Sequence, residues 1–556
     1  MVNRNIREYI YRFVPPALFI LTAVFLLCKL LPANPVWITD NGSKYIITRT
    51  IAEYGSANIR HELPELFPRG GFHFHVMDDE QIRSFHSELL PAITAPFYRI
   101  AGDISLHFLP LAATLAMLLI MTNRLKKPLL LSALVFSTPI FFYSLLYWEM
   151  TPSIFFAVAA TLLLLDEREI QSGAVIAVGI WFREELYFLA FALFCALLIR
   201  REWRTALRFA ISCAVLTAVY WGINFLSSGH ILGLHGKYYA LNNRTADTTV
   251  TEEIKGIFFN FYQHLLRFET LPAKISLLLT LSGAAGLLAA GAGKKFNSCT
   301  ALKTAALVWY IITEIILVAA LWSKCDEPLY TSAFTMGLIS STPAAAGFMV
   351  NWRALLLSHH RGISLAATAS VIYILLVPPL LTRFDIGLTW GARHFLCIMP
   401  MLAVLSFHAL KMNFKNRLTR SILWTALILP ALGMQLWAVT ALIKVSNSAA
   451  VFQQNISAMP EQTILTDIFF IPEQTPELLF EKDILEITGR KQLETALDHL
   501  RKKNQKSFIL MLSQKFRRID NESIAYLMQH SQIISEPQKL QLTSEQEIFI
   551  FRCRLL

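Results

Sequence analysis

The sequence predicts a polytopic α-helical membrane protein with a small α/β domain at its carboxyl end. Of its 556 residues, 54% are hydrophobic and only 16% are charged, whereas about a quarter of the residues of a soluble domain are charged. Apolar stretches of membrane-spanning length recur through the first 445 residues, and a more polar segment with strand and helix patterns follows. This composition excludes a single water-soluble globule, a disordered chain and a fibrous protein.

About thirteen helices account for the apolar stretches. A bilayer core about 30 Å thick requires about 20 apolar residues per helix, and shorter stretches fit tilted or re-entrant helices. We expect helices at about 13–32, 106–122, 128–147, 153–165, 172–182, 186–199, 207–227, 270–292, 301–322, 333–350, 363–381, 394–410 and 421–445. An odd number of spans places the two termini on opposite sides of the membrane.

Lys and Arg residues between the apolar stretches predict the orientation. The first 445 residues hold 37 Lys and Arg against 25 Asp and Glu, whereas the segment from Ser446 holds 13 against 14. Basic residues mark cytoplasmic loops, so a cytoplasmic N-terminus is expected. With this orientation, six basic clusters all lie on the cytoplasmic side: Arg4/Arg7/Arg12, Arg124/Lys126/Lys127, Arg200/Arg201/Arg204, Lys294/Lys295/Lys303, Arg353/Arg361 and Lys411/Lys415/Arg417/Arg420. Because no basic run is interleaved with aromatic residues, a nucleic-acid partner is not expected.

The chain therefore divides into a transmembrane module of residues 1–445 and a soluble domain of residues 446–556. A long first external loop, residues 33–105, lies within the module, and the C-terminal domain is expected on the same external side. In that domain, residues 463–470, 483–487, 507–512 and 547–551 have strand patterns, and residues 474–480, 490–504 and 520–530 have helical patterns. Alternation of the two predicts an α/β fold.

The first external loop offers a carboxylate close to the membrane surface. Asp40 follows the first apolar stretch by a few residues, and Lys44 and Tyr45 come one turn later. A carboxylate at that height is a candidate general base for an acceptor hydroxyl. The alternative is that Asp40 caps the helix that follows, with Lys44 a solvated cation and Tyr45 an interfacial aromatic residue.

Two further acidic sites interrupt apolar sequence. Glu149 stands at the outer end of the third span, and Arg183-Glu184-Glu185 separates two short apolar stretches. A charge deep in lipid costs roughly 2.5–3.5 kcal/mol, so these groups should face protein or a water-filled cavity, where they mark function. The alternative is an internal ion pair of Arg183 that locks the two short helices.

Cationic groups on the external side are candidates for binding an anionic headgroup. Arg393 and His394 precede the span that contains Pro400, and Lys237 lies in the loop of residues 228–269. A guanidinium pairs with phosphate in a bidentate manner. The alternative for Arg393 is snorkelling at the interface.

Taken together, these segments resemble the GT-C superfamily of polytopic glycosyltransferases, which use polyprenyl-phosphate-linked sugars at the outer face of the membrane. The features that match are a first external loop with an acidic residue and an external α/β tail, with the motifs Trp37-Ile-Thr-Asp40, Trp148-Glu149, Arg183-Glu-Glu185 and Gly391-Ala-Arg-His394 in the same order. The layout covers most of the chain, whereas the motifs cover a small part of it.

The resemblance implies an inverting transfer in the envelope of a bacterial inner membrane, with the C-terminus in the periplasm. It implies that Asp40 is the catalytic base, that Arg393, His394, Lys237 and Arg183 bind the donor phosphate, and that Lys44, Tyr45, Glu149 and Glu185 support substrate binding. Because Asn41 follows Asp40 in place of a second acid, we expect no metal and no other cofactor. The expected partners are a polyprenyl-phosphate sugar, an acceptor glycan, lipid or protein, and membrane lipid.

Two other functions fit the same features. A transporter or lipid flippase could use the buried Arg183-Glu184-Glu185 group for coupling, although transporters often have broken helices at matching places in two halves and only one interruption is evident. A ligase or polymerase of lipid-linked glycans also keeps arginines in external loops, and its donor would be a pyrophosphate-linked oligosaccharide.

Overall fold

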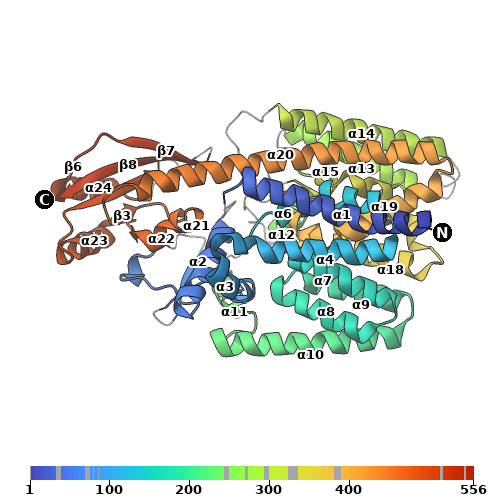
Figure 1. Cartoon of the computed structure of the whole chain (residues 1–556), viewed down its shortest axis with the longest axis horizontal. Helices are drawn as coiled ribbons and strands as arrows, with labels where there is room; N and C mark the ends of the chain where they lie inside the picture. Colours follow the sequence, from blue (N-terminus) through green and yellow to red (C-terminus); the bar gives the residue numbers. More distant parts are fainter. Residues whose placement is uncertain are drawn as a thin grey trace. The chain divides into compact units, whose positions relative to one another are not determined.

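The computed structural model forms two compact units (Figure 1). It describes residues 2–32, 39–68, 75–78, 81–84, 87–242, 250–268, 273–292, 300–323, 336–380, 390–513, 518–543 and 546–556. The first unit, here called the helical unit, comprises Met1–Leu26, His107–Glu327 and Thr331–Thr440. The second, called the sheet unit, comprises Leu27–Leu106, Pro328–Tyr330 and Ala441–Leu556, so the first external loop and the C-terminal tail fold together.

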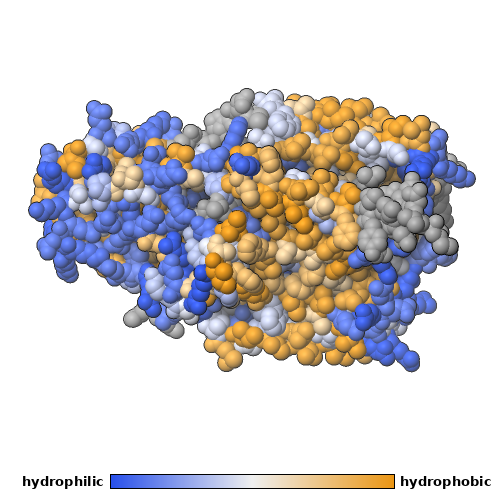
Figure 2. Space-filling view, in the orientation of Figure 1, coloured by the Kyte–Doolittle hydropathy of each residue, from blue (hydrophilic) through white to orange (hydrophobic). Residues whose placement is uncertain are grey.

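The helical unit is built from apolar helices. Among the described residues, seven helical stretches are long and apolar enough to cross a membrane: Leu89–Leu125, Trp203–Ser228, Lys274–Ala292, Thr300–Trp322, Arg361–Leu380, Arg393–Asn413 and Arg417–Ser457. Four shorter apolar helices, within Phe13–Lys29, Met150–Leu165, Glu169–Phe182 and Leu186–Ile199, accompany them. In Figure 2, apolar residues cover much of the surface over these helices, and polar residues cover the sheet unit. The prediction of an α-helical integral membrane protein is confirmed, and the total of about thirteen spans stays a prediction.

Most expected spans correspond to one helix each. The helices are α1 (Val2–Lys29), α4 (Phe108–Leu125), α7 (Met150–Leu165), α8 (Glu169–Phe182), α9 (Leu186–Ile199), α10 (Trp203–Ser228), α13 (Ala273–Ala292), α14 (Thr300–Trp322), α18 (Arg361–Leu380), α19 (Met399–Asn413) and α20 (Arg417–Ser457). The loop between α10 and α13 adds α11 (Gly233–Asn242), α12 (Val250–Phe261) and a π-helix, η4 (Tyr262–Leu266).

Two expected spans are wrong in form. Residues 128–147 form α5 (Pro128–Phe136) and α6 (Ile140–Ser144), and the described part of 333–350 forms α15 (Leu338–Ser341), the 3₁₀ turn η7 (Pro343–Ala345) and α16 (Ala346–Met349), followed by α17 (Trp352–Leu356). Pro139 and Pro343 lie at these breaks. Proline lacks the backbone N–H and clashes with the preceding turn, so a helix does not continue through it unbent. Hydropathy detects the apolar stretch and not this break.

Close backbone approach and polar contacts hold the helical unit together. Gly173 of α8 lies against α10, because a Cβ at this position would be 2.3 Å from the carbonyl oxygen of Phe209. Small residues allow such approach between helices in lipid. Lys303 of α14 donates hydrogen bonds to Asn351 Oδ1 at 2.8 Å and to Asn413 Oδ1 at 3.0 Å, joining three segments.

The sheet unit contains a six-stranded mixed sheet in the order β4-β3-β5-β8-β6, with β7 paired to β8. Its strands are β3 (Thr463–Thr466), β4 (Asp483–Glu486), β5 (Ser507–Ser513), β6 (Ser531–Ile533), β7 (Gln538–Thr543) and β8 (Gln546–Leu555). β3 runs parallel to β4 and β5, and β8 runs antiparallel to β5, β6 and β7. The helices are α21 (Ile471–Gln474), α22 (Leu478–Glu481), α23 (Arg490–Lys502) and α24 (Asn521–His530). The predicted α/β tail is confirmed.

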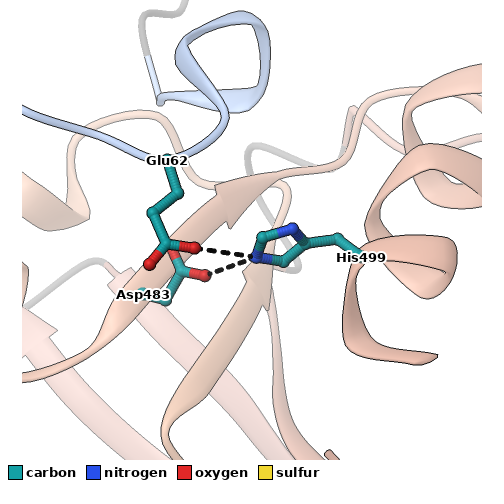
Figure 3. Close-up of side chains that lie close together, drawn as sticks. All are labelled: Glu62, Asp483 and His499. Carbon is teal, nitrogen blue, oxygen red and sulfur yellow. Dashed lines mark hydrogen bonds and ion pairs between the residues drawn. The ribbon is translucent and has the colours of Figure 1, made fainter. Parts of the chain in front are cut away.

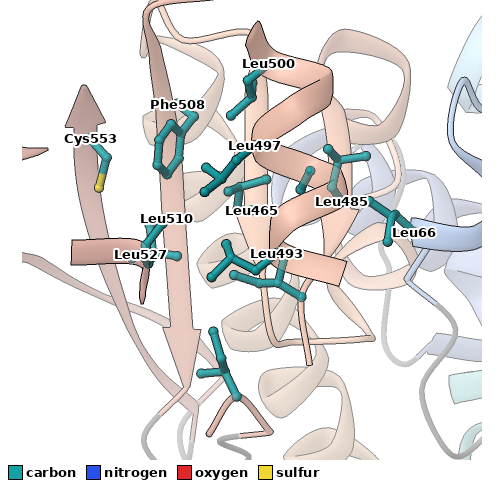
Figure 4. Close-up of a cluster of buried hydrophobic side chains, with 13 residues drawn as sticks. Leu66, Leu465, Leu485, Leu493, Leu497, Leu500, Phe508, Leu510, Leu527 and Cys553 are labelled. Carbon is teal, nitrogen blue, oxygen red and sulfur yellow. The ribbon is translucent and has the colours of Figure 1, made fainter. Parts of the chain in front are cut away.

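The first external loop completes the core of this domain. The loop contributes α2 (Thr39–Tyr54), the turn η1 (Pro64–Leu66), the hairpin β1 (His75–Asp78) and β2 (Gln81–Ser84), α3 (Leu89–Ala101) and the turn η2 (Gly102–His107). Leu66, 2% exposed, packs in the same cluster as Leu485 of β4 and Leu493 and Leu497 of α23 (Figure 4). The two segments therefore share one hydrophobic core, although the whole helical unit separates them in sequence.

Candidate functional site

Three helix ends in the helical unit bring charged residues together. Glu149 directly precedes α7, Arg183 directly follows α8 and Glu185 directly precedes α9. Because the amino-terminal end of a helix carries a partial positive charge, each carboxylate lies where its helix favours it. The apolar pattern breaks at these positions for this reason.

Arg183 binds both glutamates. Its Nη1 lies 3.1 Å from Glu149 Oε1, its Nε lies 2.9 Å from Glu185 Oε2, and its Nη2 also pairs with Glu185 Oε1. The side chains are 12–18% exposed. The internal ion pair expected as one alternative is therefore present, and it links α7, α8 and α9. The role of Arg183 in phosphate binding stays a prediction.

His394 also belongs to this cluster, although it lies much later in the sequence. It begins, with Arg393, the 3₁₀ turn η8 (Arg393–Ile398) that leads into α19. His394 Nδ1 lies 2.9 Å from Glu185 Oε1, and Arg393 Nε donates to His394 Nε2 at 3.2 Å. These partners assign the proton of a neutral His394 to Nδ1. Tyr373 of α18 donates to the backbone oxygen of His394 at 2.7 Å and holds the turn in place.

Two histidines near the cluster were not predicted. The ring of His264, in the π-helix η4, stands edge-on to His394 with 5.5 Å between ring centres. His235 of α11 lies with Nδ1 3.8 Å from Glu184 Oε2. Lys237, a predicted phosphate ligand, is half-buried on the same helix, two residues further on. The irregular turn around His264 is the type of feature often found at functional sites, but apolar patterning does not reveal it.

We call these five side chains, Glu149, Arg183, Glu185, Arg393 and His394, the arginine cluster. Its two arginines balance its two carboxylates. The arrangement can orient a guanidinium and an imidazole for an anion in a site that is largely shielded from water.

Asp40 belongs to the sheet unit and lies in the first turn of α2. Thr39, the residue before it, is the first that the structure describes after residue 32. The Asp40 carboxylate is half-buried. The capping alternative stays open, and the role of Asp40 as base stays a prediction.

Lys44 and Tyr45 are both buried, which the interpretation as solvated or interfacial residues did not anticipate. Each is 2% exposed, and Lys44 Nζ donates to the backbone oxygen of Asp40 at 3.4 Å. The Tyr45 hydroxyl donates to Asp103 Oδ1 at 3.1 Å and lies 3.2 Å from the Tyr98 hydroxyl. Burial, with a smaller effect of Asp103, raises the pKa of Tyr45 far above its usual range, so its hydroxyl stays a donor. Sequence reasoning had assigned no role to Asp103 or Tyr98.

Glu62, Asp483 and His499 form the group of described residues that could hold a metal ion, with ligand atoms within 4.8 Å of one another. Figure 3 shows both carboxylates directed at His499 Nε2, at 3.5 Å from Glu62 and 3.2 Å from Asp483. Lys503 pairs with Glu62 and lies 3.8 Å from Asp483, and its hydrogen bond lowers the pKa of Glu62. The ammonium group of Lys503 thus supplies a positive charge to the two carboxylates.

No protein-family model and no curated protein matches the sequence. The solved structures similar to the chain include two that match over 96% of its length and 97% of theirs. One is the crystal structure of ArnT from Cupriavidus metallidurans bound to undecaprenyl phosphate, with 11% sequence identity and a TM-score of 0.46. The other is the same protein in the apo state, with 10% identity and a TM-score of 0.44.

Proposed function

We propose that this protein is an inverting glycosyltransferase that moves a sugar from a polyprenyl phosphate to an envelope acceptor on the external side of a bacterial inner membrane. One observation carries the proposal. Glu149, Arg183, Glu185, Arg393 and His394, singled out from three separate segments, converge in one hydrogen-bonded cluster. Charged groups gathered among apolar helices mark a functional site.

Asp40 is the catalytic base of the proposed reaction. A polyprenyl phosphate leaves as an anion and needs little protonation, so the transfer requires one group that accepts the proton of the acceptor hydroxyl. A half-buried carboxylate in the first turn of a buried helix is suited to this task. The hydroxyl oxygen attacks the anomeric carbon, the bond to the phosphate oxygen breaks, and the proton passes to Asp40. We propose that no metal takes part, because Asn41 stands where a second acidic ligand would be needed.

Arg393 binds the donor phosphate, with Lys237 as a further donor, and His394, which contacts Glu185 and Arg393 through its two ring nitrogens, positions the Arg393 side chain. The guanidinium of Arg183 is engaged by Glu149 and Glu185, so its part is to hold Glu185, which in turn fixes the His394 ring. Preorganised donors of this kind stabilise developing negative charge without reorganisation. The acceptor is a glycan, a lipid or a protein of the envelope, and the transferred sugar is a hexose or a pentose.

The Asp40→Asn variant tests the proposal. Purified protein is incubated with a polyprenyl-phosphate sugar and a crude envelope acceptor, and transfer is measured. Loss of a general base lowers the rate by about 10²–10⁴-fold, whereas Glu167→Gln, in the exposed turn after α7, should act like the wild type. Wild-type transfer by Asp40→Asn would remove Asp40 from the mechanism, and transfer of a whole oligosaccharide from a pyrophosphate donor would identify a ligase or polymerase.

A further inference from the structure

The helix that carries Asp40 touches the C-terminal domain through a glycine. Gly42, in the first turn of α2, lies against the backbone of Glu473 in α21. A Cβ at Gly42 would stand 1.4 Å from the carbonyl oxygen of Glu473 and 2.3 Å from its carbonyl carbon. Real Cβ atoms essentially never approach closer than 3.0 Å, so no other residue fits between the two backbones.

The helix keeps this glycine at a cost. Glycine inside a helix is less stable than alanine by about 0.5–1 kcal/mol, and Gly42 has no positive φ that would demand it. Close approach of the two backbones is therefore the reason for glycine at this position.

The segment that meets Gly42 is firmly held. Ile471 at the start of α21 and Ile468 and Phe470 just before it belong to the buried core that packs on β3 and β5. The Thr475 hydroxyl donates to the backbone oxygen of Ile471 at 2.8 Å and closes this turn. The Glu473 carbonyl therefore cannot move away from α2 without disturbing the core of the sheet unit. A larger residue at position 42 would displace α2 instead.

A second contact holds the middle of the same helix. The Arg49 guanidinium lies 4.1 Å from the centre of the Phe480 ring, and Phe480 also packs against the cluster that contains Ile46. A cation over an aromatic ring contributes about 0.5–1 kcal/mol at an exposed site. This contact supports the helix, whereas the approach at Gly42 sets the position of its first turn.

We propose that the C-terminal α/β domain is a positioning element of the transferase, which fixes Asp40 through the contact between Gly42 and Glu473. Asp40 lies two residues before Gly42 in the same helical turn and moves with it. An ordinary contact begins at 3.4 Å, so a Cβ at position 42 would require a shift of roughly 2 Å. This inference rests on the proposed function, since it gives the domain a role through the catalytic base.

The experiment compares Gly42→Ala with Gly286→Ala in the full-length protein. Gly286 lies in α13 and has open space within 4 Å of an added Cβ, so this control receives the same helix-stabilising change without a clash. We expect a fall in kcat of about 10²-fold for Gly42→Ala, as a 1 Å misplacement can produce, with little change in the KM for the donor. Hydrogen exchange of α2 and α21 should rise in Gly42→Ala and not in Gly286→Ala.

A second variant guards against simple misfolding. Phe480→Leu keeps an apolar side chain and removes the aromatic face beneath Arg49, so we expect a several-fold fall in kcat and faster exchange in α2 alone. Equal kcat and equal exchange in Gly42→Ala and Gly286→Ala would overturn the inference. If the wild type transfers no sugar but Gly42→Ala loosens α2, the proposed function fails and the contact stands.

Discussion

His394 lies with its Nδ1 2.9 Å from the carboxylate of Glu185, although 209 residues separate the two in sequence. Glu185 binds Arg183 on its other side, so one carboxylate connects the turn between α8 and α9 to the start of α19. The arginine cluster therefore links distant segments of the helical unit and is also a candidate phosphate site. Substitutions in it should separate its contribution to stability from its contribution to phosphate binding.

Glu185→Gln should weaken the connection that Glu185 makes between Arg183 and His394 without opening a cavity. Glutamine still accepts a hydrogen bond from His394 but carries no charge for Arg183, and hydrogen bonds to charged groups contribute about 1.5–3 kcal/mol. We expect the thermal unfolding midpoint in detergent to fall by several degrees. Glu167→Gln, in the exposed turn after α7, is the matched control. A Glu185→Gln midpoint equal to that of the control would show that the ion pair adds no stability.

Arg393→Lys should raise the KM for the polyprenyl-phosphate donor by about tenfold and change kcat less. Lysine keeps the charge but cannot form the bidentate contact that a guanidinium makes with phosphate. Steady-state kinetics with varied donor concentration measure the effect. Arg124→Lys, half-exposed and paired with Asp166, serves as control, and an unchanged donor KM in Arg393→Lys would take Arg393 out of the phosphate site.

Leu66→Ala should destabilise the C-terminal domain, although the residue lies nearly 400 positions earlier in the chain. Truncation of a buried leucine costs about 2–5 kcal/mol, and Leu66 is 2% exposed within the core shared with β4 and α23. Faster hydrogen exchange in β4 and α23 is the expected result. Leu556→Ala, which is 69% exposed, should leave the exchange unchanged, and identical behaviour of both variants would refute the shared core.

Acid should destabilise the sheet unit through His61. His61 Nε2 lies 3.1 Å from the Ile484 carbonyl oxygen and 3.4 Å from Asp483 Oδ1. Burial lowers the pKa of His61 despite the Asp483 carboxylate, so the folded state takes up its proton at lower pH than the unfolded state does, whose histidine titrates near 6.5. Stability is therefore fully present above about pH 6.5 and falls as the pH drops below it.

The measurement is urea denaturation followed by pulse proteolysis between about pH 7.5 and 5.5. His61→Gln keeps a donor for Ile484 and cannot titrate, so its free energy of unfolding should fall less on acidification than that of the wild type. Equal slopes for the two proteins would assign the pH dependence to other groups.

The sequence predicts the apolar helices and the tail because both depend on local patterns. Leu493, Leu497 and Leu500 recur at helical spacing in α23, and β5 contains the continuous apolar run Phe508–Leu512. The short strands β6 and β7 were not predicted, because their few residues alternate weakly and gain their place by pairing with β8.

The candidate site was predicted only in part, because its geometry is not local. Arg183 and Glu149 were recognisable as charges in apolar sequence, whereas Asp103 became significant only when its bond to Tyr45 was visible. His264 likewise becomes a candidate site residue only because its ring contacts the ring of His394. No periodicity in the loop of residues 33–105 indicates that Leu66 belongs to the core of a domain that begins at residue 441.

The sheet unit is built from two segments that are far apart in the sequence, and this has a consequence during synthesis. Its first part, Leu27–Leu106, is translated about 330 residues before Ala441, an interval of roughly 20 s to one minute at about 5–20 residues per second. Until then α2 and Leu66 have no strands to pack on, and their apolar side chains are open to aggregation. A ribosome that stops before the tail would therefore leave inserted helices with a loop whose apolar side chains stay exposed.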